Sequence, residues 1–287
     1  MNTSKDDAGG RRGVVTVAVT SGKGGVGKTN VVVNLAVALA RLRNRVAILD
    51  ADFGLGNVDV LLGLTPAHHL GHLLVGQKAM EDIVVEGPLG IRVVPASSGL
   101  RELTALTPAQ WQRLREGIDS LAASLDFLLI DTGAGISSNV VDLLAGSERV
   151  LVVTSLEPTA VVDAYAMIKV VTSFDAAKEI GVLINGARDA AEADLVYRQL
   201  EVAATRFLHR RLKSYGFVAQ DPALRDAVLR QRALVDIDPQ APASRCFKIL
   251  ASRVASLAPL GGPGLRLVPR LERAGGRLTG VEAPQCA

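Results

Sequence analysis

The stretch Ser21–Asn30 reads SGKGGVGKTN, and its residue types and spacing suit the binding of phosphate groups. Gly22, Gly27, Lys28 and Thr29 fit the pattern G-x-x-x-x-G-K-[ST] of a phosphate-binding loop, or P-loop. In such a loop the backbone N–H groups surround the phosphates, the lysine contacts the β and γ phosphates, and the hydroxyl binds Mg²⁺. Three glycines of the same stretch also fit the G-x-G-x-x-G of a dinucleotide-binding turn, so the glycines alone do not decide between the two sites.

The residues around the glycines favour the P-loop. A dinucleotide-binding turn does not require Lys28 and Thr29 directly after the last glycine, whereas a P-loop needs both. Asp50, at the end of the next predicted strand, could hold a dinucleotide ribose, so that alternative keeps one supporting residue. A P-loop also needs a carboxylate at the end of another buried strand, and the run FLLID ends at Asp131. We therefore predict a Mg²⁺ site formed by Thr29 and, through water, by Asp131.

Seven short runs rich in β-branched residues are expected to be strands. Runs that are apolar on both faces are typical of parallel strands buried between two layers of helices. Because the runs alternate with helical patterns, they predict an α/β fold with a doubly wound, mostly parallel sheet of about seven or eight strands and helices on both faces. The runs span residues 14–20, 45–50, 91–96, 127–131, 149–155, 181–185 and 216–219.

The chain is predicted to form one domain with loosely held ends. Its 287 residues are 48% hydrophobic, which is enough for a sizeable core. No linker, repeat or low-complexity tract interrupts residues 14–258, so we expect a single P-loop ATPase domain there. Residues 1–13 are polar and residues 259–287 are rich in Gly, Pro and Arg, which predicts a flexible leader and a flexible tail.

Composition excludes several classes of protein. The net charge of +3 is slight for this length and does not by itself indicate nucleic acid or an anionic membrane as a partner. Two cysteines, Cys246 and Cys286, are too few for a disulfide framework or a cysteine-rich metal site. The polar N-terminus lacks the apolar core of a signal peptide, and no apolar run reaches the roughly 18 residues of a membrane span. These features predict a cytoplasmic protein.

The P-loop carries a second lysine, Lys23, and this feature marks a family. The sequence GKGGVGKT resembles the deviant Walker A motif of the MinD and ParA family of dimeric ATPases. The resemblance implies a homodimer formed with ATP, in which Lys23 reaches the nucleotide of the partner subunit. An ammonium group placed against the transferring phosphoryl group would stabilise the transition state as an arginine finger does. In an arbitrary loop, by contrast, such a lysine would simply be solvated.

Four further segments are similar to the FlhG (FleN) branch of MinD-like ATPases, which controls flagellar number and placement. They read DADFGLGNVDVLLGL, DTGAGIS, EPTAVVDAYAMIKV and DPALRDAVLRQRALVD, and the resemblance spans about residues 14–258. It implies a slow ATP hydrolase that regulates flagellar number, placement or gene expression. It also implies that Asp52 positions the attacking water, so the predicted catalytic residues are Lys23, Lys28 and Asp52. A solvated turn aspartate is the alternative for Asp52. The implied partners are an FlhF-type GTPase and a FleQ-type transcription activator.

The nucleotide is expected to be ATP, because the Asn-Lys-x-Asp signature that reads guanine in GTPases occurs nowhere in the chain. The resemblance places Asn185 on adenine, Asp221 at the base pocket and Glu157 near the ribose. Each of the three could instead cap a loop, and Asp221, which precedes Pro222, suits a helix N-cap nearly as well. The predicted nucleotide-binding residues are Gly22, Lys23, Gly24, Gly25, Val26, Gly27, Lys28, Thr29, Asn30, Glu157, Asn185 and Asp221.

Residues 243–257 form an amphipathic helical pattern with two interpretations. Its apolar arc fits a helix that attaches the protein to the cytoplasmic membrane or the cell pole, as the family resemblance implies. The arc fits a helix packed on the core equally well. The basic run at 206–213 could meet acidic lipid, DNA or a protein partner, although a solvated helix face is the commoner role of such a run. It offers no interleaved aromatic platform for single-stranded nucleic acid, and we do not expect direct DNA binding. At residues 6–12, DDAGGRR partly matches the D-Q-A-x-x-L-R pattern of GTPase-activating leaders, and we favour an unrelated polar leader.

Two other functions share this scaffold. A partition ATPase of the ParA type would bind DNA with strong dependence on salt, and the flagellar-type segments argue against it. A metabolic ATP-dependent enzyme, such as a ligase, would need a second substrate pocket that the sequence does not exclude. An iron protein would need paired cysteines at the dimer face, and the two cysteines lie outside the predicted switch segments.

Overall fold

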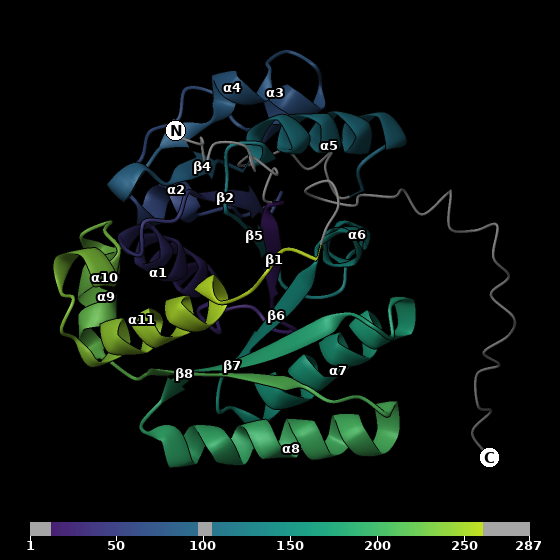
Figure 1. The fold of residues 1–287 in the computed structure, drawn as a ribbon, viewed down its shortest axis with the longest axis vertical. Helices are drawn as coiled ribbons and strands as arrows, with labels where there is room; N and C mark the ends of the chain where they lie inside the picture. The colour runs from purple at the N-terminus through teal and green to yellow at the C-terminus, as the bar shows by residue number, and fades with distance from the viewer. Residues whose placement is uncertain (1–12, 97–104, 261–287) are drawn as a thin grey trace, which may run out of the picture.

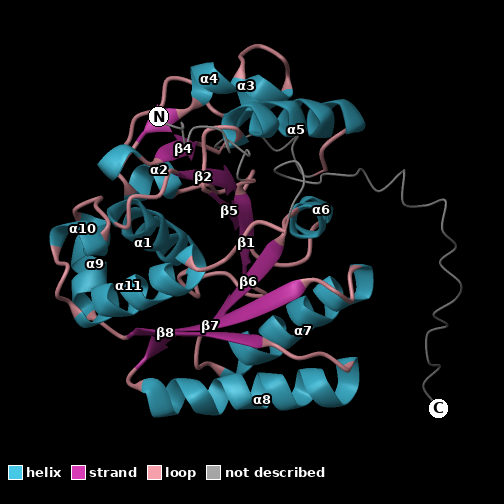
Figure 2. Ribbon diagram, in the orientation of Figure 1, coloured by secondary structure: helices cyan, strands magenta, loops and turns pink. Residues whose placement is uncertain are grey.

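The computed structural model describes residues 13–96 and 105–260, which form an eight-stranded sheet between two layers of helices (Figure 1, Figure 2). The strand order is β3-β4-β2-β5-β1-β6-β7-β8, and only β3 runs antiparallel to its neighbour. This confirms the predicted doubly wound fold. The strands are β1 (Val15–Thr20), β2 (Val46–Ala51), β3 (Val85–Glu86), β4 (Arg92–Val94), β5 (Phe127–Thr132), β6 (Arg149–Thr154), β7 (Glu179–Ala187) and β8 (Lys213–Ala219).

Helices cover both faces of the sheet, so the central strands are apolar on both sides. Along β1, Val17 and Val19 face one core while Ala18 faces the other. The helices α1, α9, α10 and α11 belong to the first core, and α3 to α8 belong to the second. The helices are α1 (Lys28–Arg41), α2 (Val58–Leu61), α3 (Leu70–Leu74), α4 (Met80–Ile83), α5 (Pro108–Ala122), α6 (Ser138–Gly146), α7 (Pro158–Phe174), α8 (Ala190–Leu208), α9 (Pro222–Leu229), α10 (Leu234–Ile237) and α11 (Pro242–Ala255), with a 3₁₀ turn at Pro88–Gly90.

The seven predicted strand runs correspond to seven of the eight strands, and the sequence prediction missed β3. This strand has only two residues, Val85 and Glu86, and pairs antiparallel with β4 at the edge of the sheet. A two-residue strand has no periodicity to detect. The parallel strands β1, β2, β5, β6 and β7 all end at the same edge of the sheet, where the loops that follow them meet.

The apolar arc of α11 lies in the core. Phe247, Leu250 and Val254 are buried in the cluster that also contains the apolar side chains of α1. The structure therefore corresponds to the core-packing interpretation of this helix, and the arc offers no free face to a membrane. In the described part of the chain no helix has the length and apolar character needed to cross a bilayer.

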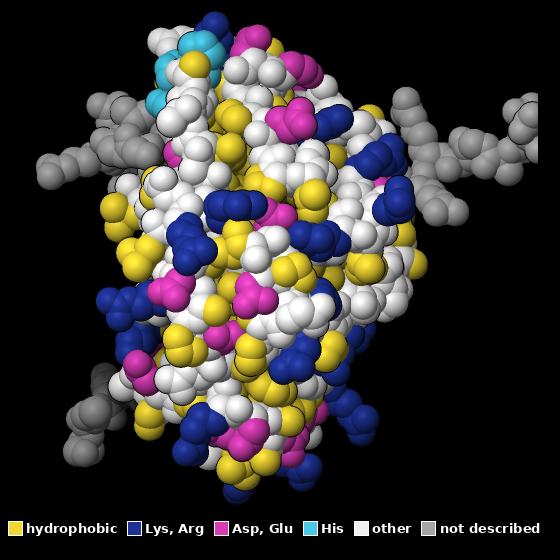
Figure 3. Space-filling model, turned by 90° about the vertical axis from the view of Figure 1, so that its left-hand side faces the viewer, with side chains coloured by type: hydrophobic (Ala, Val, Ile, Leu, Met, Phe, Trp, Pro, Cys, Tyr) yellow, Lys and Arg dark blue, Asp and Glu magenta, His cyan; other side chains and the backbone are white. Residues whose placement is uncertain are grey.

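The surface near α9 and α10 has mixed charge. Figure 3 shows this side of the molecule, where Lys and Arg side chains are interspersed with Asp and Glu. Such a surface offers no continuous basic face for an anionic polymer. Most of the predicted leader, including the DDAGGRR segment, and the tail from residue 261 lie outside the described residues. The described chain ends beside the start of β6, where Arg149 donates to the Ala258 carbonyl at 2.8 Å.

We expect Phe247→Ala to lower the free energy of unfolding by about 3–5 kcal/mol, because it leaves a cavity between α11 and the core. Ile249→Ala on the same helix is the matched control, since Ile249 is 55% exposed and its loss should change stability by less than about 0.5 kcal/mol. Urea denaturation followed by the fluorescence of the single tryptophan, the buried Trp111, measures both. Equal, small losses for the two variants would contradict the burial of the α11 arc.

Candidate nucleotide-binding site

The loop between β1 and α1 has the backbone geometry of a phosphate cradle. Gly25 and Gly27 adopt left-handed conformations, with φ of 81° and 86°, and Gly27 is the N-cap of α1. A side chain at Gly27 would also collide with the amide of Asn185, and one at Gly22 would collide with the backbone of Asp163. Only glycine satisfies both requirements at position 27. The helix N-terminus then directs free N–H groups and a positive dipole end at the loop, which favours a bound anion.

Lys28 and Asp131 form a buried ion pair directly beneath this loop. Lys28 Nζ lies 2.6 Å from Asp131 Oδ1, and the side chains are 8% and 1% exposed. Burial raises the pKa of Asp131, an effect that Lys28 and the neighbouring Thr29 hydroxyl oppose. The second oxygen, Asp131 Oδ2, is buried and has no hydrogen-bond partner among the described residues. A buried carboxylate oxygen without a partner, close to a threonine hydroxyl, suits Mg²⁺ and its bound waters. The predicted metal residues therefore fit the ion.

Asp50 is a buried carboxylate whose place in the site the sequence prediction missed. It is the second-last residue of β2 and lies in register beside Asp131, the second-last residue of β5. Burial and the charge of Asp131 raise the pKa of Asp50 to about 7. Its oxygens accept hydrogen bonds from the backbone N–H groups of Asp52 (3.2 Å) and Val58 (3.1 Å). The available signal was an aspartate at the end of a buried strand, which the sequence analysis linked only to the dinucleotide alternative.

Asp52 lies at the rim of an open cleft of about 550 Å³ beside the P-loop. Its Oδ1 accepts a hydrogen bond from the Leu55 backbone at 3.1 Å, so the side chain is held within its own turn. The loop that follows β2 therefore faces the start of α1 across this cleft. The predicted residues that line the cleft are Gly24, Gly25, Gly27, Lys28, Thr29, Asn30 and Asp52.

Lys23 lies at a second open cleft, of about 480 Å³, on the other side of the P-loop. Its Nζ is 2.6 Å from Glu157 Oε2 and 3.1 Å from Thr159 Oγ1, at the N-terminus of α7. The Lys23 side chain is 40% exposed, whereas Lys28 is buried. The two lysines of the loop therefore have different environments. The predicted residues that line this second cleft are Lys23, Gly24, Gly25, Val26, Glu157 and Asn185.

Asn185 and Asp221 both make structural contacts in this chain. Asn185 Nδ2 donates to the Val26 carbonyl at 2.8 Å and so holds the P-loop against the end of β7. Asp221 accepts from the backbone N–H of Ala223 and from that of Ala243, each at 3.0 Å. It therefore caps α9 and α11 together, and it is not among the residues that line the second cleft. The adenine contact of Asn185 and the base-pocket role of Asp221 stay predictions.

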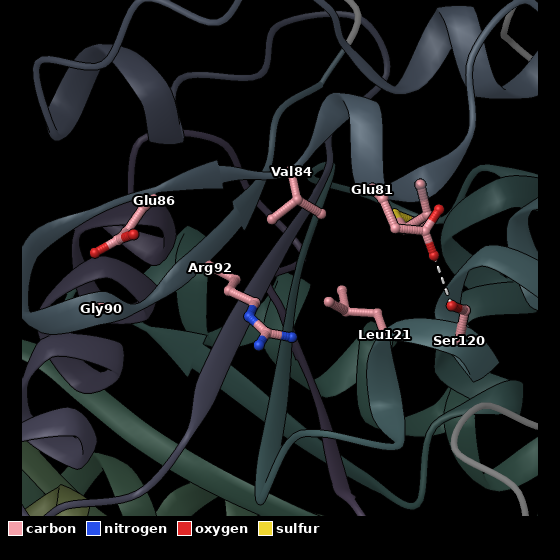
Figure 4. A pocket seen from close by; sticks show the side chains of 8 residues that line it. Glu81, Val84, Glu86, Gly90, Arg92, Ser120 and Leu121 are labelled. Carbon is pink, nitrogen blue, oxygen red and sulfur yellow. Dashed lines mark hydrogen bonds between the residues drawn. The ribbon is translucent and has the colours of Figure 1, made fainter.

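A separate cavity of about 570 Å³ lies at the β3 and β4 edge of the sheet (Figure 4). Arg92 points into it and donates to Ser124 Oγ at 2.6 Å, while Ser120 donates to Glu81 at 2.7 Å. The lining also includes Glu86, so two carboxylates accompany one guanidinium. This cavity has no glycine loop at a helix N-terminus, and its carboxylates would repel phosphate. We therefore place the nucleotide at the P-loop.

Comparison with known proteins agrees with this geometry. Residues 17–235 match the family described as CobQ/CobB/MinD/ParA nucleotide binding domain. The chain is 43% identical to the antiactivator FleN of Pseudomonas aeruginosa over 243 residues, which cover 85% of this chain and 87% of FleN. The chain belongs to the MinD/ParA family, in its FleN (FlhG) branch. The resemblance inferred from the sequence motifs is thereby confirmed.

Two further relatives show how widely this MinD/ParA similarity extends. The flagellum site-determining protein YlxH of Helicobacter pylori is 31% identical over 84% of this chain and 81% of its own length. The solved structure of the Pyrococcus furiosus cell division ATPase MinD superimposes with a TM-score of 0.72 at 26% identity, covering 85% of this chain and 99% of that chain. Members of the MinD/ParA family are ATPases, which supports ATP hydrolysis as the activity of this site.

In the absence of Mg²⁺ and nucleotide, we expect the free energy of unfolding of the wild type to fall, relative to that of Asp50→Asn, as the pH rises from about 4 to about 7. The folded protein keeps the Asp50 proton over this range, whereas the unfolded chain, with the ordinary pKa of 3.8, releases it. Raising the pKa from 3.8 to about 7 corresponds to a loss of at most about 4 kcal/mol in the free energy of unfolding over this pH range. Urea denaturation at several pH values measures the difference.

Asp226→Asn is the matched control, because Asp226 is an exposed carboxylate on α9. Its replacement should leave the pH dependence of the unfolding free energy as in the wild type. A stability difference between the wild type and Asp50→Asn that does not vary with pH would contradict a raised pKa for Asp50.

Proposed function

We propose that this protein is an ATP-dependent dimerisation switch that regulates flagellar number, placement or gene expression. The observation that carries the proposal is the different environment of the two P-loop lysines. Lys28 is buried against Asp131, where it serves the nucleotide of its own subunit. Lys23 lies at the surface beside Glu157, where a second copy can approach it. A loop with one inward and one outward lysine suits a nucleotide held between two subunits.

Exposed apolar side chains around the P-loop support a second copy as the partner of this face. Leu55 and Val60, which line the first cleft, are 77% and 51% exposed. Ile136, in the loop after β5, is 60% exposed. Val162 on α7 is 66% exposed, and its neighbour in sequence, Asp163, packs against Gly22 of the P-loop. Burying such side chains against another subunit is favourable, and their position at the nucleotide edge of the sheet couples that burial to the bound nucleotide.

The side chains divide the work of hydrolysis. Bound Mg-ATP supplies the reacting γ phosphoryl group. Thr29 and Asp131 would hold Mg²⁺, and Lys28 would neutralise charge on the β and γ phosphates. Asp52 would orient water in line with the γ phosphate, and Lys23 of a second copy would stabilise the charge of the transition state. Because Asp52 orients water without acting as a strong base, we propose slow turnover, which suits a regulatory switch.

The flagellar role rests on the relatives named above, the antiactivator FleN and the flagellum site-determining protein YlxH. By analogy with an antiactivator, we propose a FleQ-type transcription activator as one partner and an FlhF-type GTPase as another. We further propose that the protein acts in the cytoplasm, with attachment at the cytoplasmic membrane or the cell pole. That attachment would need a surface other than the apolar arc of α11, which lies in the core.

We expect wild-type ATP hydrolysis per subunit to rise with protein concentration, because the site is completed by a second copy. Lys23→Ala should lower kcat by at least about tenfold while ATP affinity changes by less than about threefold. Lys169→Ala, which removes an exposed lysine on α7, is the control and should keep the wild-type rate. Phosphate release measured across a range of protein concentrations tests this. A rate per subunit that is independent of concentration and unaffected by Lys23→Ala would reject the switch.

The flagellar part of the proposal has its own test. We expect a purified FleQ-type activator to bind the protein more tightly with a non-hydrolysable ATP analogue than with ADP, because ATP creates the dimeric surface. Calorimetry or surface plasmon resonance measures both affinities. Lack of binding with either nucleotide would remove the transcription activator from the proposal while leaving the ATPase intact.

A further inference from the structure

We propose that Asp50 is a positioning residue that fixes the loop of residues 52–58, and through it Asp52, over the phosphate loop. The inference rests on the proposed function, since it assigns Asp52 the water-orienting role described above. It adds a residue that acts from beneath the site and contacts neither nucleotide nor water in that role.

The Asp50 carboxylate binds the backbone at both ends of one loop, and we call this pair of hydrogen bonds the clamp. Oδ1 accepts from the backbone N–H of Asp52 at 3.2 Å, where the loop leaves β2. Oδ2 accepts from the backbone N–H of Val58 at 3.1 Å, where α2 begins. The Asp50 side chain is fully buried, so water does not compete for these bonds. Two N–H groups that lie six residues apart in sequence are thus tied to one carboxylate.

The middle of the loop, at Gly56, packs directly against Asp50. A Cβ atom at Gly56 would lie 2.7 Å from Asp50 Oδ2 and would collide with the side chain of Ala96, which follows β4. Gly56 is therefore required for the loop to lie this close to Asp50 and the sheet. Gly54 in the same loop differs, because the nearest atom to its Cβ would be 3.9 Å away. The close packing is therefore at Gly56, which lies in sequence between the two residues whose N–H groups Asp50 binds, Asp52 and Val58.

The clamped loop and the helix it leads into form one wall of the first cleft. Asp52, Leu55, Asn57 and Val60 all line that cleft, opposite Lys28 and Thr29. β2 and β5 are in register at Asp50 and Asp131, so the loop is anchored next to the predicted Mg²⁺ ligand. Releasing either end would leave the P-loop intact but allow Asp52 to move. A misplacement of about 1 Å can cost about 100-fold in rate.

The test compares Asp50→Asn and Gly56→Ala with the wild type. The amide of asparagine keeps the volume of the side chain but can accept from only one of the two N–H groups. We expect each variant to lower kcat by at least about tenfold, with ATP affinity measured by a fluorescent analogue within about threefold. Hydrogen exchange at the Asp52 and Val58 amides should be faster in Asp50→Asn, which reports the clamp without any reaction.

Asp226→Asn, at an exposed carboxylate on α9, is the matched control and should keep the wild-type kcat and the wild-type exchange of the loop amides. A folded Asp50→Asn with unchanged kcat and unchanged exchange would overturn the inference. If Asp50→Asn does not fold, Gly56→Ala decides, and a normal kcat in that variant overturns it. If the wild type hydrolyses no ATP, the proposed function fails, whereas the exchange rates still decide whether Asp50 clamps the loop.

Discussion

The ion pair between Lys28 and Asp131 sets the electrostatics on which this site depends. One buried lysine faces two carboxylates, because Asp50 and Asp131 lie in register near the ends of neighbouring strands. In a buried setting such an excess of negative charge is costly, and it is relieved by a proton or by a cation. The pKa of Asp50, which burial and the charge of Asp131 raise to about 7, corresponds to the first solution. Mg²⁺ held at Asp131 would provide the second.

The same contacts connect the predicted nucleotide site to exposed parts of the molecule. Asp131 lies at the predicted Mg²⁺ position, and Asp50 holds the loop that carries Asp52. That loop presents the exposed Leu55 beside the first cleft. On the other side of the P-loop, Asn185 supports the backbone of Val26, and Lys23 contacts the start of α7. Both walls of the site therefore end in surface elements. A partner subunit that covers them would act on the same loops that bind the nucleotide.

Much of this fold could be predicted because its signals are local. The β-branched runs identified seven strands, and the order of glycines, Lys28 and Thr29 identified the P-loop without any structure. The role of α11 could not be decided, since an amphipathic pattern does not say whether its apolar face meets lipid or α1. Asp50 was missed as a site residue because its hydrogen bonds depend on the path of the loop. The double cap formed by Asp221 likewise joins helices that are distant in sequence.

In the proposed switch, ATP and not ADP joins two copies of the protein through this face. The most direct test is the solution mass of Asp52→Ala by light scattering, because a variant that binds ATP without hydrolysing it should hold the ATP state. We predict a dimer with Mg-ATP and a monomer with Mg-ADP. A mass that is the same with both nucleotides, under conditions where both are bound, would contradict the switch and favour a metabolic ATPase on this scaffold.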